Sequence, residues 1–230
     1  MFKIGIVENF HKDGIKLLED HPNFEYEIID DVSKENLIKK LPKFDGLTLR
    51  VAKLGSDVLR NCKKLKVISR HGVGYDNVDI NHLKKNNITL LITATGNALA
   101  VAEHVMYMML SLSKGVTLYD SEVRSGNFKK NANKIETYEL YKKEILIAGF
   151  GRIGKNLIKR CLGFDMKVNI FDPFIDESTI KSYGGNKVDN LQTAIKTSDF
   201  VSIHMPLNEK TRNLIAVSYT HLTLPTTRLV

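Results

Sequence analysis

Apolar and polar positions alternate with two different periodicities over residues 1–97. Short apolar runs recur as KIGIV, EYEII, DGLTLR, KVIS and TLLIT, and amphipathic segments of helical length separate them. Strands that alternate with helices are the signature of βαβ units. This part of the chain is therefore expected to form a parallel sheet flanked by helices.

The stretch that follows, residues 97–124, has a helical period instead. Its apolar side chains recur every three or four positions, as in one face of a helix. The pattern predicts one long helix over this stretch. The residues that define its apolar face are Val101, Val105, Met108, Met109 and Leu112.

A second alternating series begins at Glu144. It contains the strand EILIAGF, a helix through Cys161, the strand KVNIFD, a helix near Leu191 and the strand DFVSIHMP. The polar stretch SGNFKKNANKIETYE before it is typical of a connection. The series predicts a second α/β domain, entered through the long helix.

The last fourteen residues, VSYTHLTLPTTRLV, do not fit this pattern. They contain no acid and four threonines, and they follow a strand where a doubly wound domain needs another helix. The string looks like an in-frame translation of a sequencing-library adapter, which leaves a natural β-rich tail as the alternative. The first interpretation predicts that the native sequence departs from this one after Ala216.

Composition favours a globular protein without a membrane span. Charged residues make up 26% of the chain, and no apolar run reaches the length of about 18 residues that a spanning helix needs. The N-terminus MFKIGIVENF lacks the regions of a signal peptide, so a cytoplasmic protein is expected. Cys62 and Cys161 lie far apart and in no metal-ligand spacing, which predicts no metal site.

The net charge of +8 favours anionic partners. The lysines are scattered and are not interleaved with aromatic residues, so nucleic acid is not an expected partner. A small carboxylate or phosphate substrate and a dinucleotide fit the charge better.

The segment from Gly149 to Gly154 is a GxGxxG motif that directly follows a predicted strand and opens a predicted helix. The first glycine permits a tight turn, the second lets the backbone approach a pyrophosphate, and the third lets the helix pack on the strand. The helix N-terminus then faces the phosphates. Within the motif, Gly149, Gly151, Arg152, Ile153 and Gly154 are the expected cofactor-binding residues.

Asp172 ends the next predicted strand, eighteen residues after Gly154. An acid there can accept hydrogen bonds from the adenosine ribose hydroxyls, and it would repel the 2′-phosphate of NADP. The sequence therefore predicts NAD as the cofactor. The alternative is a tight glycine turn followed by an ordinary turn aspartate.

His204 ends the strand DFVSIH and so belongs to the carboxyl edge of the second sheet, where open α/β domains bind ligands. Histidine titrates near neutrality and is a candidate general base for hydride transfer. The alternative is a histidine that only shapes the cofactor pocket beside Pro206.

Four separated blocks of sequence carry a family resemblance. They are SRHGVGYDNVD (69–79), TGNALAVAEHVMYMMLSL (95–112), IAGFGRIGKNLIKRCLGFDMKV (147–168) and SDFVSIHMPLNEKTRNLI (198–215). In order and spacing they resemble the D-2-hydroxyacid dehydrogenase family, especially its D-3-phosphoglycerate dehydrogenase branch. The resemblance covers essentially residues 1–216.

The resemblance implies a two-domain α/β fold in which a flavodoxin-like, split substrate domain carries an inserted Rossmann NAD-binding domain, both incomplete here. Residues 1–97 would be the first part of the substrate domain, 98–216 the truncated NAD-binding domain, and 217–230 the non-native tail. Family members are dimers, which implies a homodimer through helix 98–113.

The resemblance also implies roles for individual residues. Gly72, Val73 and Gly74 would form the loop that approaches the substrate carboxylate, and Arg50 would contact the substrate, although Val51 replaces the serine often found next to it. A strand-end cation in solvent is the alternative for Arg50. Asn97 would line the pocket, with a helix N-cap as its alternative. His204, with Pro206 and Thr211, would belong to the cofactor pocket.

The family's catalytic arginine, glutamate and histidine would lie beyond residue 216. The resemblance thus implies an NAD-dependent oxidoreductase acting on the CH–OH group of a 2-hydroxy acid, most similar to the phosphoglycerate dehydrogenases of serine biosynthesis, with this chain inactive by itself. The alternatives are reduction of hydroxypyruvate, glyoxylate or D-lactate, and a non-catalytic dinucleotide-sensing corepressor.

Overall fold

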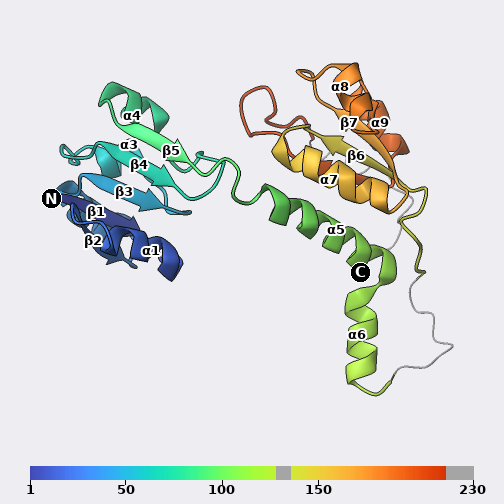
Figure 1. Ribbon diagram of the computed structural model, residues 1–230, viewed down its shortest axis with the longest axis horizontal. Coiled ribbons are helices and arrows are strands. Elements are labelled where there is room, and N and C mark those ends of the chain that lie inside the picture. The colour runs from blue at the N-terminus through green and yellow to red at the C-terminus, as the bar shows by residue number, and fades with distance from the viewer. Residues whose placement is uncertain (128–135, 216–230) are drawn as a thin grey trace. The chain divides into compact units, whose positions relative to one another are not determined.

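The structure is a computed structural model that describes residues 1–127 and 136–215 of the 230-residue chain. The described residues divide into two compact units between Gly96 and Asn97 (Figure 1). The tail at 217–230 and most of the expected polar connection at 125–139 lie outside the described residues, so both stay predictions.

The first unit is built on a five-stranded parallel sheet in the order β2-β1-β3-β4-β5. This is the order of flavodoxin-like doubly wound folds. Each strand lies within one residue of its predicted bounds, and the α/β prediction is confirmed. The strands are β1 (Phe2–Val7), β2 (Phe24–Ile29), β3 (Gly46–Leu49), β4 (Val67–Arg70) and β5 (Thr89–Ile92).

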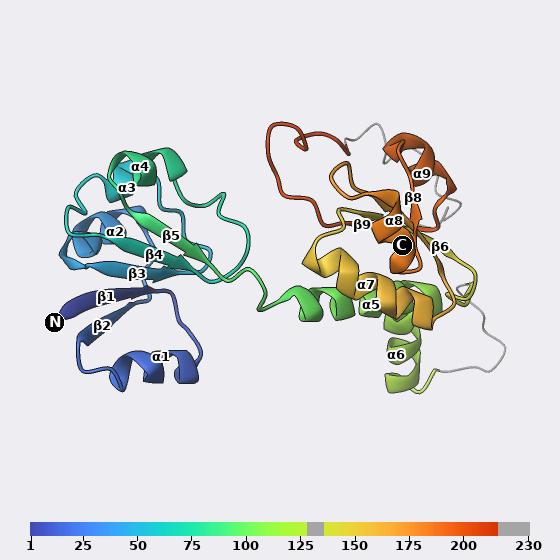
Figure 2. The same ribbon diagram turned by 45° about the horizontal axis from the view of Figure 1, so that its top comes forward.

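Helices cover both faces of this sheet (Figure 2). The chain reverses its direction across the sheet after β2, and right-handed crossovers then place the later helices on the face opposite to α1. The larger part of the hydrophobic core lies on the sheet face that these later helices cover, and it includes the fully buried Leu47, Leu49 and Ile68. The helices are α1 (Lys12–Glu19), α2 (Lys34–Lys40), α3 (Ser56–Leu59) and α4 (Ile80–Lys85), with a short 3₁₀ turn at Leu41–Lys43.

The single long helix predicted over residues 97–124 is wrong. The structure has two helices there, α5 (Ala98–Lys114) and α6 (Val116–Arg124), and Gly115 between them adopts the left-handed conformation with φ 59°. The Gly115 N–H donates to the carbonyls of Leu112 and Ser111, which closes the end of α5. The apolar period continues through this break, so the pattern alone did not reveal it.

The second unit contains a four-stranded parallel sheet in the order β8-β7-β6-β9, which corresponds to 3-2-1-4 in a Rossmann fold. The predicted strands and helices of this series are confirmed, and a short helix and strand that the pattern did not reveal, α8 and β8, lie between them. The elements are β6 (Glu144–Ala148), α7 (Arg152–Gly163), β7 (Lys167–Phe171), α8 (Glu177–Ser182), β8 (Asn186–Lys187), α9 (Leu191–Thr197) and β9 (Phe200–Ile203).

Helix α5 packs against α7 within the second unit (Figure 1). Met106 of α5 lies within 3.8 Å of the Cys161 thiol of α7, sulfur to sulfur. Burial raises the pKa of that thiol to about 12, so it is a neutral core group. At the surface of the same contact, Arg160 donates to the Glu103 carboxylate at 3.0 Å.

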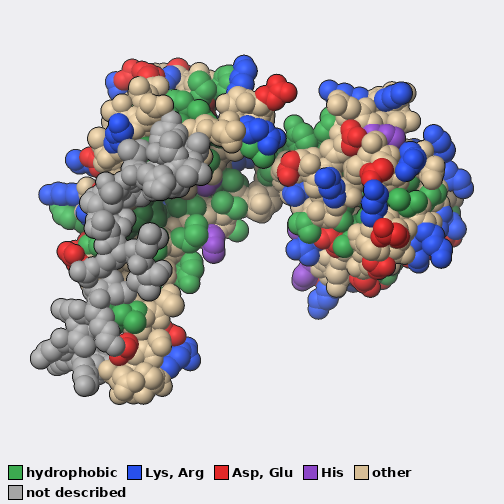
Figure 3. Space-filling model, turned by 180° about the vertical axis from the view of Figure 1, so that it is seen from behind, with side chains coloured by type: hydrophobic (Ala, Val, Ile, Leu, Met, Phe, Trp, Pro, Cys, Tyr) green, Lys and Arg blue, Asp and Glu red, His purple; other side chains and the backbone are tan. Residues whose placement is uncertain are grey.

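No helix among the described residues is long and apolar enough to cross a membrane. Lysine and arginine side chains are mixed with carboxylates over the face of the first unit that Figure 3 shows, in agreement with the scattered charge of the sequence.

Candidate functional site

Each sheet has one point at which the strand order reverses, and open α/β sheets bind ligands beside that point, at the carboxyl ends of the strands. In the second unit it lies between β6 and β9. The chain leaves β6 through the glycine motif and leaves β9 through His204. In the first unit it lies between β1 and β3, and the chain leaves β3 at Arg50.

The three glycines of the motif face different surroundings. Gly149 has φ 102°, and a Cβ there would stand 2.8 Å from the carbonyl carbon and oxygen of His204. At Gly154 a Cβ would meet the Gly149 carbonyl oxygen at 2.6 Å. At Gly151 a Cβ would meet nothing within 4 Å. The first and third glycines are thus required by the protein itself, whereas the second borders open space.

Helix α7 begins directly at this open space. Gly151 is its N-cap and, like every glycine, has no side chain to accept from the first turn, which contains no acidic residue. The N–H groups of the first turn thus have no N-cap side chain to which they could donate. The dipole and these donors make an anion site, and the residues present fit the pyrophosphate of a dinucleotide.

The Asp172 carboxylate is tied to the glycine loop. Its Oδ2 atom accepts from the Phe150 N–H at 2.8 Å, and its Oδ1 atom accepts from the Phe174 N–H at 2.9 Å. The side chain therefore holds the loop and its own turn together while each oxygen keeps a further lone pair. The sequence predicted a ribose contact for this residue, with a turn aspartate as the alternative, and the bond to the glycine loop was missed.

His204 lies directly beside the glycine loop, with its backbone next to Gly149. Its N–H donates to the Ala148 carbonyl at 2.7 Å, and its Nε2 shares a hydrogen bond of 2.8 Å with the Ser202 hydroxyl. Burial lowers the pKa of the imidazole, which keeps the ring neutral near pH 7. A neutral imidazole beside the phosphate-facing loop is suited to form a wall of the cofactor pocket.

Pro206 and Thr211 belong to one closed loop after β9. The Thr211 hydroxyl donates to the Pro206 carbonyl at 2.6 Å and accepts from the Asn208 N–H at 2.9 Å. The Asn208 carboxamide oxygen accepts from two further N–H groups of the loop. The Thr211 side chain thus fixes the loop that follows His204.

Arg50 in the first unit follows β3, and its backbone is clamped by Glu8. The Glu8 Oε2 atom accepts from the N–H groups of Arg50, Val51 and Ala52 at 3.1, 2.7 and 3.1 Å. On the other side, the Asn77 carboxamide donates to the carbonyls of Arg50 and Ala52. The clamp leaves the Arg50 side chain exposed at the carboxyl edge of the sheet.

Sequence reasoning missed Glu8 as a residue of this site. The signal was present, because a charged residue directly follows the buried end of a strand in KIGIVE. Its backbone has φ 70°, which is unusual for a residue with a side chain.

The predicted substrate loop follows β4, next to Arg50, since the His71 N–H donates to the Leu49 carbonyl at 2.7 Å. Gly72 has φ 140°, and the Arg70 guanidinium occupies the place that a Cβ would take, with Nη1 1.5 Å from it. Val73 and Gly74 are exposed. The glycine at 72 is therefore required by its positive φ, whereas the Arg70 guanidinium is the end of a flexible side chain and could move aside.

Asn97 starts α5 in the second unit. Its carbonyl accepts the first helical hydrogen bond, from the Val101 N–H at 2.9 Å, but its side chain makes no cap bond. Asn97 thus occupies the N-cap position, while its carboxamide does not act as the cap.

The described part of the chain contains no group of three or more His, Cys, Asp or Glu side chains that could hold a metal ion. The chemistry of the described sites is therefore built from backbone N–H groups, one carboxylate and one imidazole in the second unit, and an exposed guanidinium in the first.

Comparison with known proteins gives matches over both units. A model of the NAD binding domain of the D-isomer specific 2-hydroxyacid dehydrogenases matches residues 106–230. The chain is 33% identical to the D-3-phosphoglycerate dehydrogenase of Methanocaldococcus jannaschii, across 94% of this chain and 40% of that protein. It is also 33% identical to the hydroxypyruvate reductase of Thermotoga maritima, across 93% of this chain and 68% of that protein.

Among solved structures, the NAD⁺-bound 3-phosphoglycerate dehydrogenase of Entamoeba histolytica is similar with a TM-score of 0.75 and 26% identity. The match covers 91% of this chain and 64% of that one. By length, the chain spans 40% of the Methanocaldococcus relative.

Proposed function

Because the chain belongs to the D-isomer specific 2-hydroxyacid dehydrogenase family, we propose that the whole protein is an NAD-dependent oxidoreductase acting on the CH–OH group of a 2-hydroxy acid, most similar to D-3-phosphoglycerate dehydrogenase. The observation that carries the proposal is the glycine loop, in which Gly151 alone of the three motif glycines borders open space, at the N-terminus of α7. We also propose that the protein acts in the cytoplasm.

The second unit is the NAD-binding domain of this family. Bound NAD would accept a hydride from the hydroxyl-bearing carbon of the substrate. The first turn of α7 would hold the pyrophosphate, and Asp172 would hold the ribose. His204 and the closed loop through Pro206 and Thr211 would form a wall of the cofactor pocket.

The first unit would hold the substrate at the edge where β3 and β4 end. The exposed guanidinium of Arg50 would pair with an anionic group of the substrate, and the backbone of the loop Gly72 to Gly74 would approach its carboxylate. Asn97, at the start of α5, would be a further substrate-binding residue. Glu8 would act as a positioning residue, because its three hydrogen bonds fix the backbone from which Arg50 projects.

Reduction of hydroxypyruvate is the second candidate. It is favoured by the relative from Thermotoga maritima, of which the chain covers 68% at the same identity as the phosphoglycerate dehydrogenase.

The test begins with the genomic sequence beyond the codon for Ala216, where the family resemblance places a catalytic arginine, glutamate and histidine. The protein translated from it is then assayed with NAD and D-3-phosphoglycerate, and with NADH and hydroxypyruvate. Activity on phosphoglycerate supports the first candidate and activity on hydroxypyruvate alone the second. If the genome encodes the printed tail and a stop codon, dehydrogenase activity is not expected.

Asp172→Asn is expected to lower the preference for NAD over NADP by about tenfold or more. The asparagine keeps the shape of the side chain but removes the charge that repels a 2′-phosphate. The measurement is the ratio of the two dissociation constants by calorimetry. Asp165→Asn is the matched control, because Asp165 precedes β7 at its opposite end in a left-handed turn that asparagine tolerates. An unchanged ratio in Asp172→Asn would refute the assigned role.

We propose further that two copies of the protein pair through α5. The outer face of this helix exposes Tyr107, Met108 and Leu112, with exposed fractions of 61%, 44% and 68%, and Val116 extends the row past the break. A contiguous apolar row of this kind marks a protein contact.

Leu112→Glu is expected to weaken dimerisation by about tenfold or more, because it places a charge within an apolar contact. Analytical ultracentrifugation over a range of concentrations measures the effect. Leu17→Glu is the matched control, since Leu17 is an exposed leucine on α1 with an exposed fraction of 74%. Equal effects of both substitutions would argue against α5 as the interface.

A further inference from the structure

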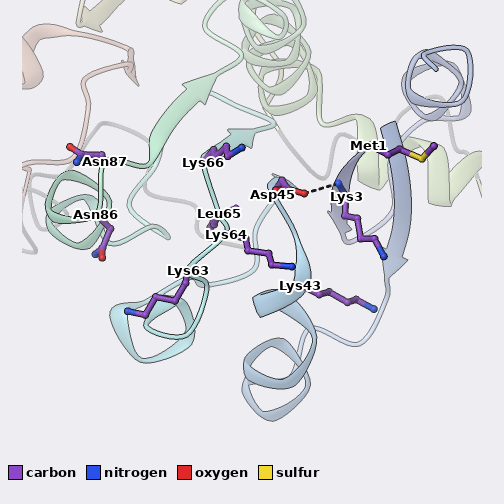
Figure 4. A pocket seen from close by; sticks show the side chains of 10 residues that line it. All are labelled: Met1, Lys3, Lys43, Asp45, Lys63, Lys64, Leu65, Lys66, Asn86 and Asn87. Carbon is purple, nitrogen blue, oxygen red and sulfur yellow. Dashed lines mark hydrogen bonds between the residues drawn. The ribbon is translucent and has the colours of Figure 1, made fainter. Parts of the chain in front are cut away.

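The first unit has a basic hollow of about 650 Å³ at the amino ends of its strands (Figure 4). This is the sheet edge opposite to Arg50 and Gly72. At about 3.3 Å per residue, strands of four to six residues separate the two edges by roughly 13–20 Å. Five lysines line the hollow, and Asp45 is the only acid among the described lining residues. The lysines are Lys3, Lys43, Lys63, Lys64 and Lys66.

The backbone beneath the hollow is part of the sheet. The Asp45 N–H donates to the Lys3 carbonyl, and the Lys66 N–H donates to the Asp45 carbonyl, both at 2.8 Å. The Asp45 carboxylate accepts from the Lys3 N–H at 2.9 Å. These bonds fix the positions from which Lys3 and Lys66 project.

Three of the lysines come from one short segment, the KKLK sequence before β4. Cys62 and Leu65 are buried and anchor this segment, and the Leu65 N–H donates to the Cys62 carbonyl at 3.2 Å. The alternation of buried and exposed positions turns Lys63, Lys64 and Lys66 outward. The positive charge is thus presented by an anchored segment.

The positive charge of the hollow is only partly compensated. Lys3 lies 3.7 Å from the Glu25 carboxylate, and Lys43 pairs with Glu27. Lys66 lies over the Phe2 ring at 4.9 Å. In the part of the chain that the structure describes, Lys63 and Lys64 form no ion pair with an acid. Like charges brought together in a concave surface raise the local concentration of anions.

We propose that this hollow is a second binding site, for a compact polyanion of phosphate type such as an inorganic triphosphate or the phosphate chain of a nucleotide. Its volume falls within the range of small-molecule pockets. Lysine acts as a point charge, which suits phosphate oxygens. The described lining residues include no aromatic ring on which a base could stack. A hollow also favours a small anion over a nucleic-acid strand, which needs an extended groove.

The test is a calorimetric titration of inorganic triphosphate into the 230-residue chain at low salt, in which a variant of the hollow separates binding there from binding at the glycine loop. The double variant Lys63→Gln/Lys64→Gln is expected to bind at least about tenfold more weakly than the unsubstituted chain. Both side chains are exposed, so the melting temperature should not change. The control Lys12→Gln/Lys16→Gln removes the same charge from α1, outside the hollow, and should bind as the unsubstituted chain does.

Three outcomes would overturn the proposal. Equal weakening in the two double variants would mean that the overall charge of the chain attracts the anion. ATP that binds much more tightly than triphosphate would mean that the base is recognised. A short oligothymidylate that binds more tightly than triphosphate and is lost in Lys63→Gln/Lys64→Gln would assign the surface to nucleic acid. The proposal does not depend on the dehydrogenase function, so it can fail or hold independently of it.

Discussion

Replacing Gly151 with alanine is expected to weaken NAD binding by about tenfold or more while the chain stays at least as stable as before. The added methyl group meets nothing of the protein within 4 Å, and the backbone is in an extended conformation with φ −77°. Alanine can adopt this conformation, and it lowers the entropy of the unfolded chain, which stabilises by about 0.4–1 kcal/mol. The same methyl group fills the space through which the backbone approaches the pyrophosphate.

The measurement combines calorimetric titration of NAD with a thermal melt of the same preparation. Gly163→Ala is the matched control, because Gly163 is the last residue of the same helix and a Cβ there also meets nothing within 4 Å. The control should bind NAD as the unsubstituted chain does. If Gly151→Ala keeps full affinity for NAD, the open space beside Gly151 is not where the dinucleotide binds. If it loses stability together with affinity, the effect is one of folding.

The strands and the dinucleotide motif could be predicted from the sequence because both depend on local patterns. A buried parallel strand is a short apolar run, and each glycine of the motif has its role through its position between β6 and α7. The separate roles of the three glycines within the motif could be assigned only from the structure. Only the surroundings of Gly149, Gly151 and Gly154 show which glycine the protein needs and which one a ligand needs.

The features that could not be predicted come from residues that the fold brings together. Glu8 and Arg50 are 42 positions apart, and their contact arises because β1 and β3 are neighbours in the sheet. The lysines of the basic hollow look scattered along the chain for the same reason, since Lys3 and Lys66 come to lie on either side of Asp45 only in the folded sheet. The break at Gly115 was missed for a different reason: one left-handed residue ends a helix without interrupting the apolar period.

Gly149→Ala is expected to destabilise the second unit by about 2–5 kcal/mol, the largest effect of any single methyl group considered for this chain. Two costs add. The residue has φ 102°, which a side chain disfavours, and the new Cβ would stand 2.8 Å from the His204 backbone and 3.0 Å from the Met205 N atom. Backbone cannot move aside as a flexible side chain can, so β9 must shift away from β6.

The two costs can be separated with matched controls in urea unfolding. Gly126→Ala carries a positive φ of 70° but a Cβ there meets nothing within 4 Å, so it reports the backbone cost alone. Gly163→Ala carries neither cost. The expected order of unfolding free energies is Gly163→Ala above Gly126→Ala above Gly149→Ala. If Gly149→Ala is no less stable than Gly126→Ala, β9 yields to the methyl group easily. The close approach of His204 to the glycine loop would then be a contact that deforms easily, and the segments that follow β6 and β9 would be free to move apart around a ligand.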